Sequence, residues 1–205
     1  QWFEPKLYCC AERGTEYVYA RKAIAGLQGQ ALKSKRHDVN QVERRFAPSY
    51  RRYSAADREA CRQLFDRWLD RKLGALDDDT DMLQRHMLSD ARSVHAYLWD
   101  FFQPLGLEGR VAEIAGQVAA YTFGCRVNAD TFCILAEVAD PDVSGLASFI
   151  FRAFADDEAL RSCRYLNAMD DYGLPAMTRA KQSWRPEFLE PVYTVTEKGV
   201  GFDFC

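Results

Sequence analysis

The chain has 205 residues, of which 48% are hydrophobic and 28% are charged, and its formal net charge is −3. This balance is typical of a folded globular domain and excludes an intrinsically disordered chain. The small negative charge gives no overall attraction to nucleic acid or to an anionic membrane, and the longest uncharged run, residues 114–125, is shorter than the about 20 apolar residues of a transmembrane helix.

Residues 1–14 begin the chain with an apolar, aromatic segment that is interrupted by Pro5. We predict an extended N-terminal arm here and a helical domain at 15–171. The first helix is predicted over residues 15–36, because their apolar side chains recur at helical spacing. The sequence begins at Gln1 and not at Met, which leaves open whether a leader was removed or the chain begins inside a longer protein.

Residues 33–53 are basic and aromatic. The cations of this stretch are Lys33, Lys35, Arg36, Arg44, Arg45, Arg51 and Arg52. Only Asp38 and Glu43 oppose them, and three aromatic side chains lie among them. Because RNA-binding surfaces combine cations with stacking rings, nucleic acid is one candidate partner. The alternatives are a solvated helix face and a surface that docks on an acidic partner protein.

Two amphipathic helices are predicted next. Ser54 and Asp57 form a variant of the capping box at the start of a helix that ends near Gly74. Residues 81–103 place apolar side chains every three or four positions, and Pro104 ends this helix. We interpret it as the central helix, on which the other helices pack. Its apolar row is Leu83, Met87, Ala91, Val94, Leu98 and Phe101, with His95, Trp99 and Phe102 beside it.

The acidic run DDDTD at 77–81 connects these two helices. It resembles the aspartate-rich DDxxD motif of isoprenoid synthases, in which carboxylates bind magnesium and diphosphate. The resemblance implies a metal site at Asp77, Asp78 and Asp81. The alternative is an acidic loop that favours the positive end of the following helix.

Four further helices are predicted at about 108–124, 129–139, 145–155 and 157–169, because these segments are rich in apolar and small residues.

The loop DPDVSG at 140–145 resembles the first half of a calcium-binding EF-hand loop. Asp140, Asp142 and Ser144 would be the ligands. The twelfth position of the motif should be a glutamate but is Phe151, so we expect little affinity for calcium. The alternative is a turn rich in aspartate and serine.

Residues 172–205 form a Pro-rich segment followed by a predicted β-hairpin over 192–204. A lone hairpin is marginally stable in water. The hairpin must therefore pack on the helices, pair with the N-terminal segment or add to the sheet of a partner.

No GxSxG, Walker or GxGxxG motif is present, and no histidine lies in a Glu-x-x-His pair. The sequence therefore predicts a mainly α fold, an irregular bundle of five to seven helices with a short C-terminal β-hairpin. Its expected function is that of a non-catalytic helical subunit or adaptor in a larger assembly, with other protein subunits as partners and no cofactor. A metal- and diphosphate-dependent helical enzyme and a helical RNA-binding protein are the alternatives.

Seven cysteines, an odd number without a CxxC pair, favour free thiols over a secreted disulfide scaffold. We therefore predict an intracellular, reducing compartment, either the cytoplasm or the interior of an organelle.

Overall fold

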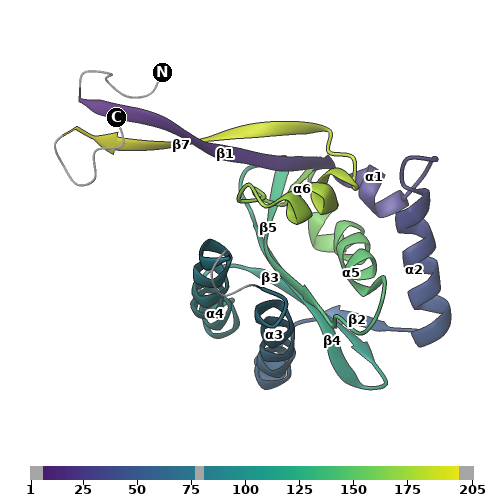
Figure 1. The fold of residues 1–205 in the computed structure, drawn as a ribbon. Coiled ribbons are helices and arrows are strands. Elements are labelled where there is room, and N and C mark those ends of the chain that lie inside the picture. The colour runs from purple at the N-terminus through teal and green to yellow at the C-terminus, as the bar shows by residue number, and fades with distance from the viewer. Residues whose placement is uncertain (1–6, 77–80, 199–205) are drawn as a thin grey trace.

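The computed structural model describes residues 7–76 and 81–198, which form a seven-stranded mixed sheet with helices on both faces (Figure 1). The strands are β1 (Tyr8–Ala20), β2 (Ser49–Arg52), β3 (Glu108–Ile114), β4 (Gln117–Arg126), β5 (Thr131–Ala139), β6 (Tyr165–Asn167) and β7 (Phe188–Glu197). The helices are α1 (Arg21–Gly26), α2 (Lys33–Phe46), α3 (Arg58–Leu73), α4 (Met82–Phe101), α5 (Leu146–Ala155) and α6 (Pro175–Gln182), with short 3-10 turns η1 (Ala55–Asp57) and η2 (Glu158–Leu160). The strand order is β2-β3-β4-β5-β6-β1-β7.

The sheet has a helical layer on each side. Helices α3 and α4 cover one face, where Phe65 and Trp99 pack on Tyr121 of the central strand β4 (Figure 1). Helices α1, α2 and α5 cover the other face, where Ile150 belongs to the same core as Ala120. Both faces of the central strands are therefore buried.

The predicted mainly α fold is wrong, because the segments 108–124 and 129–139 form the antiparallel strands β3, β4 and β5. Residues 118–124 of β4 are all buried. A strand that is covered on both faces has a continuous apolar run instead of alternation, and periodicity alone cannot tell such a run from a buried helix.

Two other predicted helices are also wrong. Residues 15–36 contain the end of β1 and the helix α1, and α2 begins only at Lys33. In β1, Tyr17 and Tyr19 both lie on the face covered by α5. A spacing of two residues on one face is the pattern of a strand. Residues 157–169 contain η2 and the strand β6. Both β1 and β6 are held by pairing with distant segments, which local spacing does not record.

The helices predicted at 54–74, 81–103 and 145–155 correspond to α3, α4 and α5. The predicted capping box of Ser54 and Asp57 is confirmed, at the η1 turn that leads into α3. However, α4 is not central. It lies beside α3 on one face of the sheet, with His95, Leu98 and Trp99 buried and with Val94 and Phe101 of the predicted apolar row exposed.

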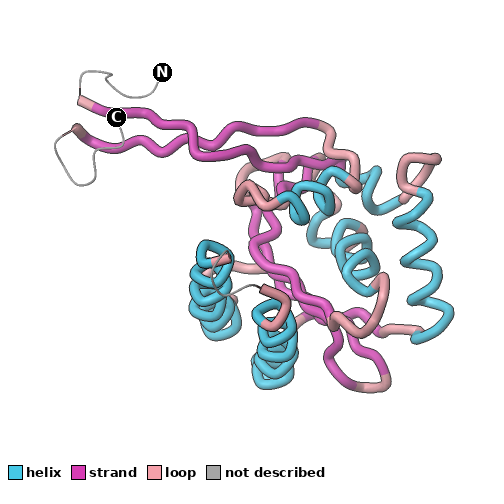
Figure 2. Tube along the Cα trace, viewed as in Figure 1, coloured by secondary structure: helices cyan, strands magenta, loops and turns pink. Residues whose placement is uncertain are grey.

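Of the three packing arrangements considered for the C-terminal hairpin, pairing with the N-terminal segment is the one found. Strand β7 is antiparallel to β1 from Tyr8 to Val18, and the two strands make a long ribbon whose outer half extends beyond the helices (Figure 2). The second strand of the predicted hairpin lies outside the described residues.

None of the helices within the described ranges is long and apolar enough to cross a membrane. Cys9 is disulfide-bonded, whereas Cys10, Cys61, Cys125, Cys133 and Cys163 are free thiols. The compartment therefore stays a prediction.

Candidate functional site

The candidate site lies where the parallel strands β5 and β6 separate. These strands pair only from Thr131 to Cys133 and from Tyr165 to Asn167, after which β6 ends and β5 continues to Ala139. In open sheets, ligands bind beyond the carboxyl ends of strands, at the point where neighbouring strands stop following each other. In the described residues, the backbone edge of β5 beyond Cys133 therefore has no partner strand on the β6 side.

A β-bulge lies immediately beyond this separation point. Phe123 pairs with Ala136 and Gly124 with Ile134, so Leu135 has no opposite residue on β4. Gly124 is required here, because a Cβ on it would lie 2.3 Å from the carbonyl oxygen of Cys133. Bulges are frequent beside active sites, where they change the direction of backbone and side-chain groups.

The segment after β6 is held in one conformation. The side-chain oxygen of Asn167 accepts a hydrogen bond from the backbone N–H of Met169 at 2.7 Å, and its amide group donates to the carboxylate of Glu16. Met169 and Tyr172 have φ values of 60° and 52°. Left-handed backbone is uncommon at non-glycine residues, and strained residues of this kind cluster at functional sites.

Lys181 of α6 anchors the same segment. Its Nζ donates hydrogen bonds to the carbonyl oxygens of Ala168, of Met169 at 3.2 Å and of Asp170 at 2.6 Å. Burial lowers the pKa of Lys181, and the nearby carboxylate of Asp170 opposes this change. The ammonium group is therefore used to fix the backbone of residues 168–170.

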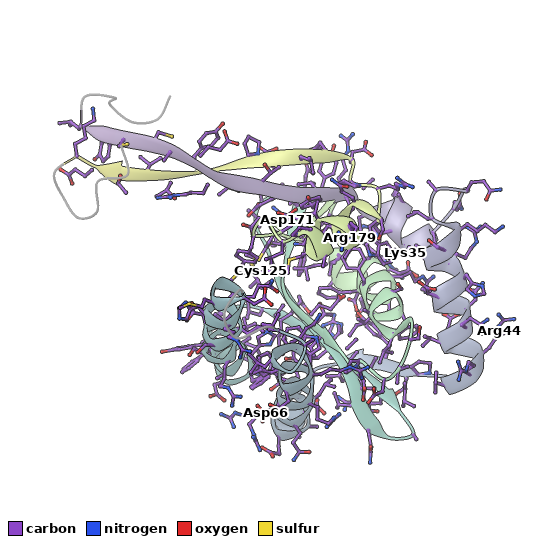
Figure 3. The ribbon with its side chains drawn as sticks, in the orientation of Figure 1. Lys35, Arg44, Asp66, Cys125, Asp171 and Arg179 are labelled. Atoms are coloured by element: carbon purple, nitrogen blue, oxygen red, sulfur yellow. The ribbon has the colours of Figure 1, made fainter. Side chains whose placement is uncertain are left out.

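Asp170 and Asp171 are neighbours with opposite environments. The carboxylate of Asp171 accepts hydrogen bonds from the hydroxyls of Thr178 at 2.5 Å and of Tyr17 at 2.6 Å, which hold its pKa below the usual range. Burial raises the pKa of Asp170, and Lys181 only partly opposes it. Within the described residues, no other side chain donates a hydrogen bond to Asp170. Figure 3 shows Asp171 near α6, well away from Arg44 on α2 and Asp66 on α3.

A second polar group lies further along β5. Glu137 alternates with Ala136 and Val138, which face α3 and α4, so its carboxyl group points to the opposite face of the sheet. Its Oε2 and the Oγ1 of Thr122, directly opposite on β4, are buried without a hydrogen-bond partner. Burial raises the pKa of Glu137 to about 8, against a smaller opposing effect of the Thr122 hydroxyl.

This row continues on β3. Arg110 lies opposite Thr122, and its guanidinium makes two hydrogen bonds to Asp157, at 2.6 and 2.7 Å. Tyr50 also donates to Asp157, at 3.0 Å. Charged groups are rarely buried unless they are paired, so this pair is structural.

The thiol of Cys133, at the separation point, is not an activated nucleophile. Burial raises the pKa of Cys133 to about 12. The thiolate is the reactive form of cysteine, and at neutral pH this thiol is protonated.

The basic stretch 33–53 does not form one surface. Lys33, Arg44 and Arg45 are exposed on α2. The remaining cations contact other groups of the chain, although Arg52 is also exposed. Lys35 lies over the ring of Trp184, Arg36 donates to the carbonyls of Leu27 and Gly29, Arg51 pairs with Asp57 and Glu113, and Arg52 pairs with Glu158. Binding of a partner or of nucleic acid by the exposed cations stays a prediction.

The predicted metal ligands are placed as follows. Asp77 and Asp78 lie outside the described residues, and Asp81 precedes α4 and accepts a hydrogen bond from Gln84 at 3.3 Å. Asp140 and Asp142 form ion pairs with Arg67 and Arg71 of α3, and Ser144 is exposed. In the part of the chain that the structure describes, no three metal-binding side chains lie close enough to hold an ion.

Sequence reasoning missed the separation point of β5 and β6 and every residue around it. The available signal was weak: two aspartates, Asp170 and Asp171, followed by a Tyr-Gly turn. The partners of this segment, Glu16, Tyr17 and Lys181, are distant in the sequence, so no local motif joins them.

A family model described as "Phosphatidylglycerol lysyltransferase, C-terminal" matches residues 7–196. A comparison with the curated proteins finds no match.

Three solved structures illustrate the fold. A conserved protein of unknown function from Bacteroides thetaiotaomicron is similar with a TM-score of 0.80 and 23% identity, over 94% of this chain and 63% of that one. The structure of L-PGS from Bacillus licheniformis has a TM-score of 0.67 and 13% identity, over 96% and 63%. FemX has a TM-score of 0.61 and 7% identity, over 88% and 60%. These structures share the mixed α/β fold of this chain, and the chain spans less than two thirds of the length of each of them.

Proposed function

Because this chain belongs to the family of phosphatidylglycerol lysyltransferase C-terminal domains, we propose that it is part of a transferase that moves a lysyl group onto the head group of phosphatidylglycerol. The family match over almost the whole chain is the observation that carries this proposal. The open edge of β5, with its bulge and the fixed segment after β6, is the place where we expect the reaction.

Family membership corrects the function predicted from the sequence. The chain is not a non-catalytic helical adaptor, because its family is one of transferases. The two alternatives, a metal- and diphosphate-dependent helical enzyme and a helical RNA-binding protein, are wrong for the same reason and because the fold is mixed α/β. A transferase that works with the backbone of a sheet leaves no short sequence motif, which explains the error.

The reaction is an acyl transfer. The hydroxyl oxygen of the lipid glycerol attacks the carbonyl carbon of an activated lysyl ester, and a new ester C–O bond forms. The C–O bond of the donor breaks, and the hydroxyl proton passes to the departing oxygen. Negative charge develops on the carbonyl oxygen, and backbone N–H donors stabilise such charge. Beyond Cys133, the groups of β5 that point toward β6 have no partner strand, which supports this role.

The charge around the site suits a lysyl group. At neutral pH the lysyl side chain is an ammonium ion. Asp170 belongs to the segment that follows β6, and Glu16 contacts that segment through Asn167; no side chain in the described ranges donates a hydrogen bond to the Asp170 carboxylate, although the Lys181 ammonium lies near it. We expect the substrate ammonium to donate a hydrogen bond to the Asp170 carboxylate, in addition to the nearby charge of Lys181.

Substitution of Asp170 tests this site. The full-length protein is incubated with phosphatidylglycerol dispersed in detergent and with an activated lysyl ester, and lysyl lipid is measured by mass spectrometry. Asp170→Asn should lower the rate about 10- to 100-fold, the loss expected for one charge-assisted hydrogen bond. Because burial disfavours the charged carboxylate, the neutral amide should leave the melting temperature unchanged.

Asp142→Asn is the matched control, since Asp142 is an exposed carboxylate in the loop after β5, where it pairs with Arg71 of α3. It should retain the wild-type rate. Absence of lysyl lipid with folded wild-type protein would refute the proposed function. An unchanged rate for Asp170→Asn would instead show that Asp170 does not bind the substrate.

A further inference from the structure

A pocket of about 480 Å³ opens where β1 ends, α1 begins and β6 begins. Its polar lining consists of Lys22, Arg161, Ser162, Arg164, Tyr165 and Glu187. The pocket lies at the opposite end of β6 from the transferase site, because that site follows Asn167 and the pocket precedes Leu166. It is therefore a separate feature of the fold.

The pocket concentrates positive charge in a chain whose net charge is negative. Lys22, Arg161 and Arg164 face one acid, Glu187, and none of these cations forms an ion pair within the described residues. Elsewhere in the fold many arginines are paired, as Arg110 is with Asp157. Unneutralised arginine and lysine at a pocket are suited to the phosphate group, whose oxygens accept several hydrogen bonds from them.

The backbone around the pocket is fixed before any ligand binds. The buried side chain of Arg21 donates hydrogen bonds to the carbonyls of Ala155 and Cys163, both at 2.9 Å. Arg126 holds the hydroxyl of Ser162 at 2.7 Å and adds a further positive charge beside the pocket. A fixed arrangement reduces the entropy that is lost on binding.

The surroundings of the pocket indicate which phosphate it takes. Phe188 is 39% exposed, with its ring against that of Tyr165 at 5.2 Å, and Val127 is 60% exposed next to Arg126. Cations beside exposed apolar side chains are typical of surfaces that rest on anionic bilayers. The ring of Tyr165 is covered by Arg164, at 4.9 Å, and by Phe188, so this ring is not free for the base stacking found at nucleic-acid sites.

We infer that this pocket binds the phosphodiester group of an anionic phospholipid and holds the domain on a membrane surface. The choice of phosphatidylglycerol as the lipid rests on the proposed function. In that arrangement, Lys22, Arg161 and Arg164 contact the phosphate, while Phe188 and Val127 reach the apolar edge of the head-group layer.

The test is sedimentation of the full-length protein with vesicles of phosphatidylcholine alone or mixed with phosphatidylglycerol, without any lysyl donor. Wild-type protein should bind the mixed vesicles preferentially. The variant Lys22→Gln/Arg161→Gln/Arg164→Gln should lose at least about tenfold in affinity, since each cation near an anionic surface contributes to binding. The control Lys33→Gln/Arg44→Gln/Arg45→Gln removes the same charge from α2 and should bind like the wild type.

Equal losses in the two triple variants would overturn the proposal, because they would show binding by overall charge alone. No loss in the pocket variant would overturn it as well. Binding of inorganic phosphate at the pocket without any preference for phosphatidylglycerol vesicles would identify a site for a free anion. Binding of a single-stranded RNA in place of vesicles would identify a nucleic-acid site. The transfer assay in detergent needs no vesicle surface. A negative result in that assay would therefore refute the proposed function, whereas only the sedimentation assay decides whether the pocket binds anionic phospholipid.

Discussion

At the scale of single residues, Glu137 combines burial with a missing hydrogen-bond partner. Its pKa is about 8 in the folded chain and about 4.5 when unfolded. Between these values the folded state binds the proton and the unfolded state does not. The free energy of unfolding therefore falls as the pH rises from about 4.5 to 8, and the contribution of the protonated carboxyl is lost above pH 8.

Glu137→Gln should remove this pH dependence, because the amide keeps the shape of the carboxyl group without its charge. Urea unfolding at pH 5 and pH 9 measures the effect. From pH 5 to pH 9, the free energy of unfolding of the variant should rise by a few kcal/mol relative to that of the wild type. This is on the order of the free energy that corresponds to the pKa shift. Glu12→Gln, at an exposed position on β1, should change neither curve. A parallel pH dependence in Glu137→Gln and the wild type would show that another group titrates.

At the scale of elements, α6 and the segment after β6 form one unit through Lys181. Lys181→Met removes the donor of three carbonyl hydrogen bonds and leaves those carbonyls partly buried. We expect a loss of about 2 kcal/mol in the free energy of unfolding and a lower transfer rate, because unsatisfied buried groups retain their desolvation cost. Arg179→Met, on the same helix but exposed, should be within about 0.5 kcal/mol of the wild type. Similar values for both variants would mean that the anchor is unimportant.

The same elements show how far sequence reasoning reaches. The helices α3, α4 and α5 were predicted because each has a helical apolar stripe, and Ser54 with Asp57 gave the start of α3. The strands β3 to β5 were not predicted, because burial on both faces removes the alternation of apolar and polar residues that identifies a strand. Strand β6 has three residues and is held by β1 and β5. The candidate site depends on that pairing, so its position could not be predicted before the sheet was known.

At the scale of the whole molecule, β6 separates the two proposed binding regions. The proposed transferase site lies beyond Asn167, and the cationic pocket lies before Leu166. An enzyme that acts on a membrane lipid must keep its reaction site at a fixed distance from the bilayer. A rigid strand between a phosphate-binding pocket and an acyl-transfer site would provide such a spacing.

The β1–β7 ribbon is the part of the molecule that the core supports least. Its inner half, near Tyr17 and Leu189, continues the sheet, whereas its outer half, near Cys10 and Val195, extends beyond the helices (Figure 2). An isolated two-stranded ribbon is marginally stable in water, and hydrogen exchange proceeds through local opening. Amide exchange measured by mass spectrometry should therefore be fast at 8–12 and 193–197 and slow in β4, whose residues 118–124 are buried. Equally slow exchange in the outer ribbon of the full-length protein would show that another part of that protein, or a partner, covers it.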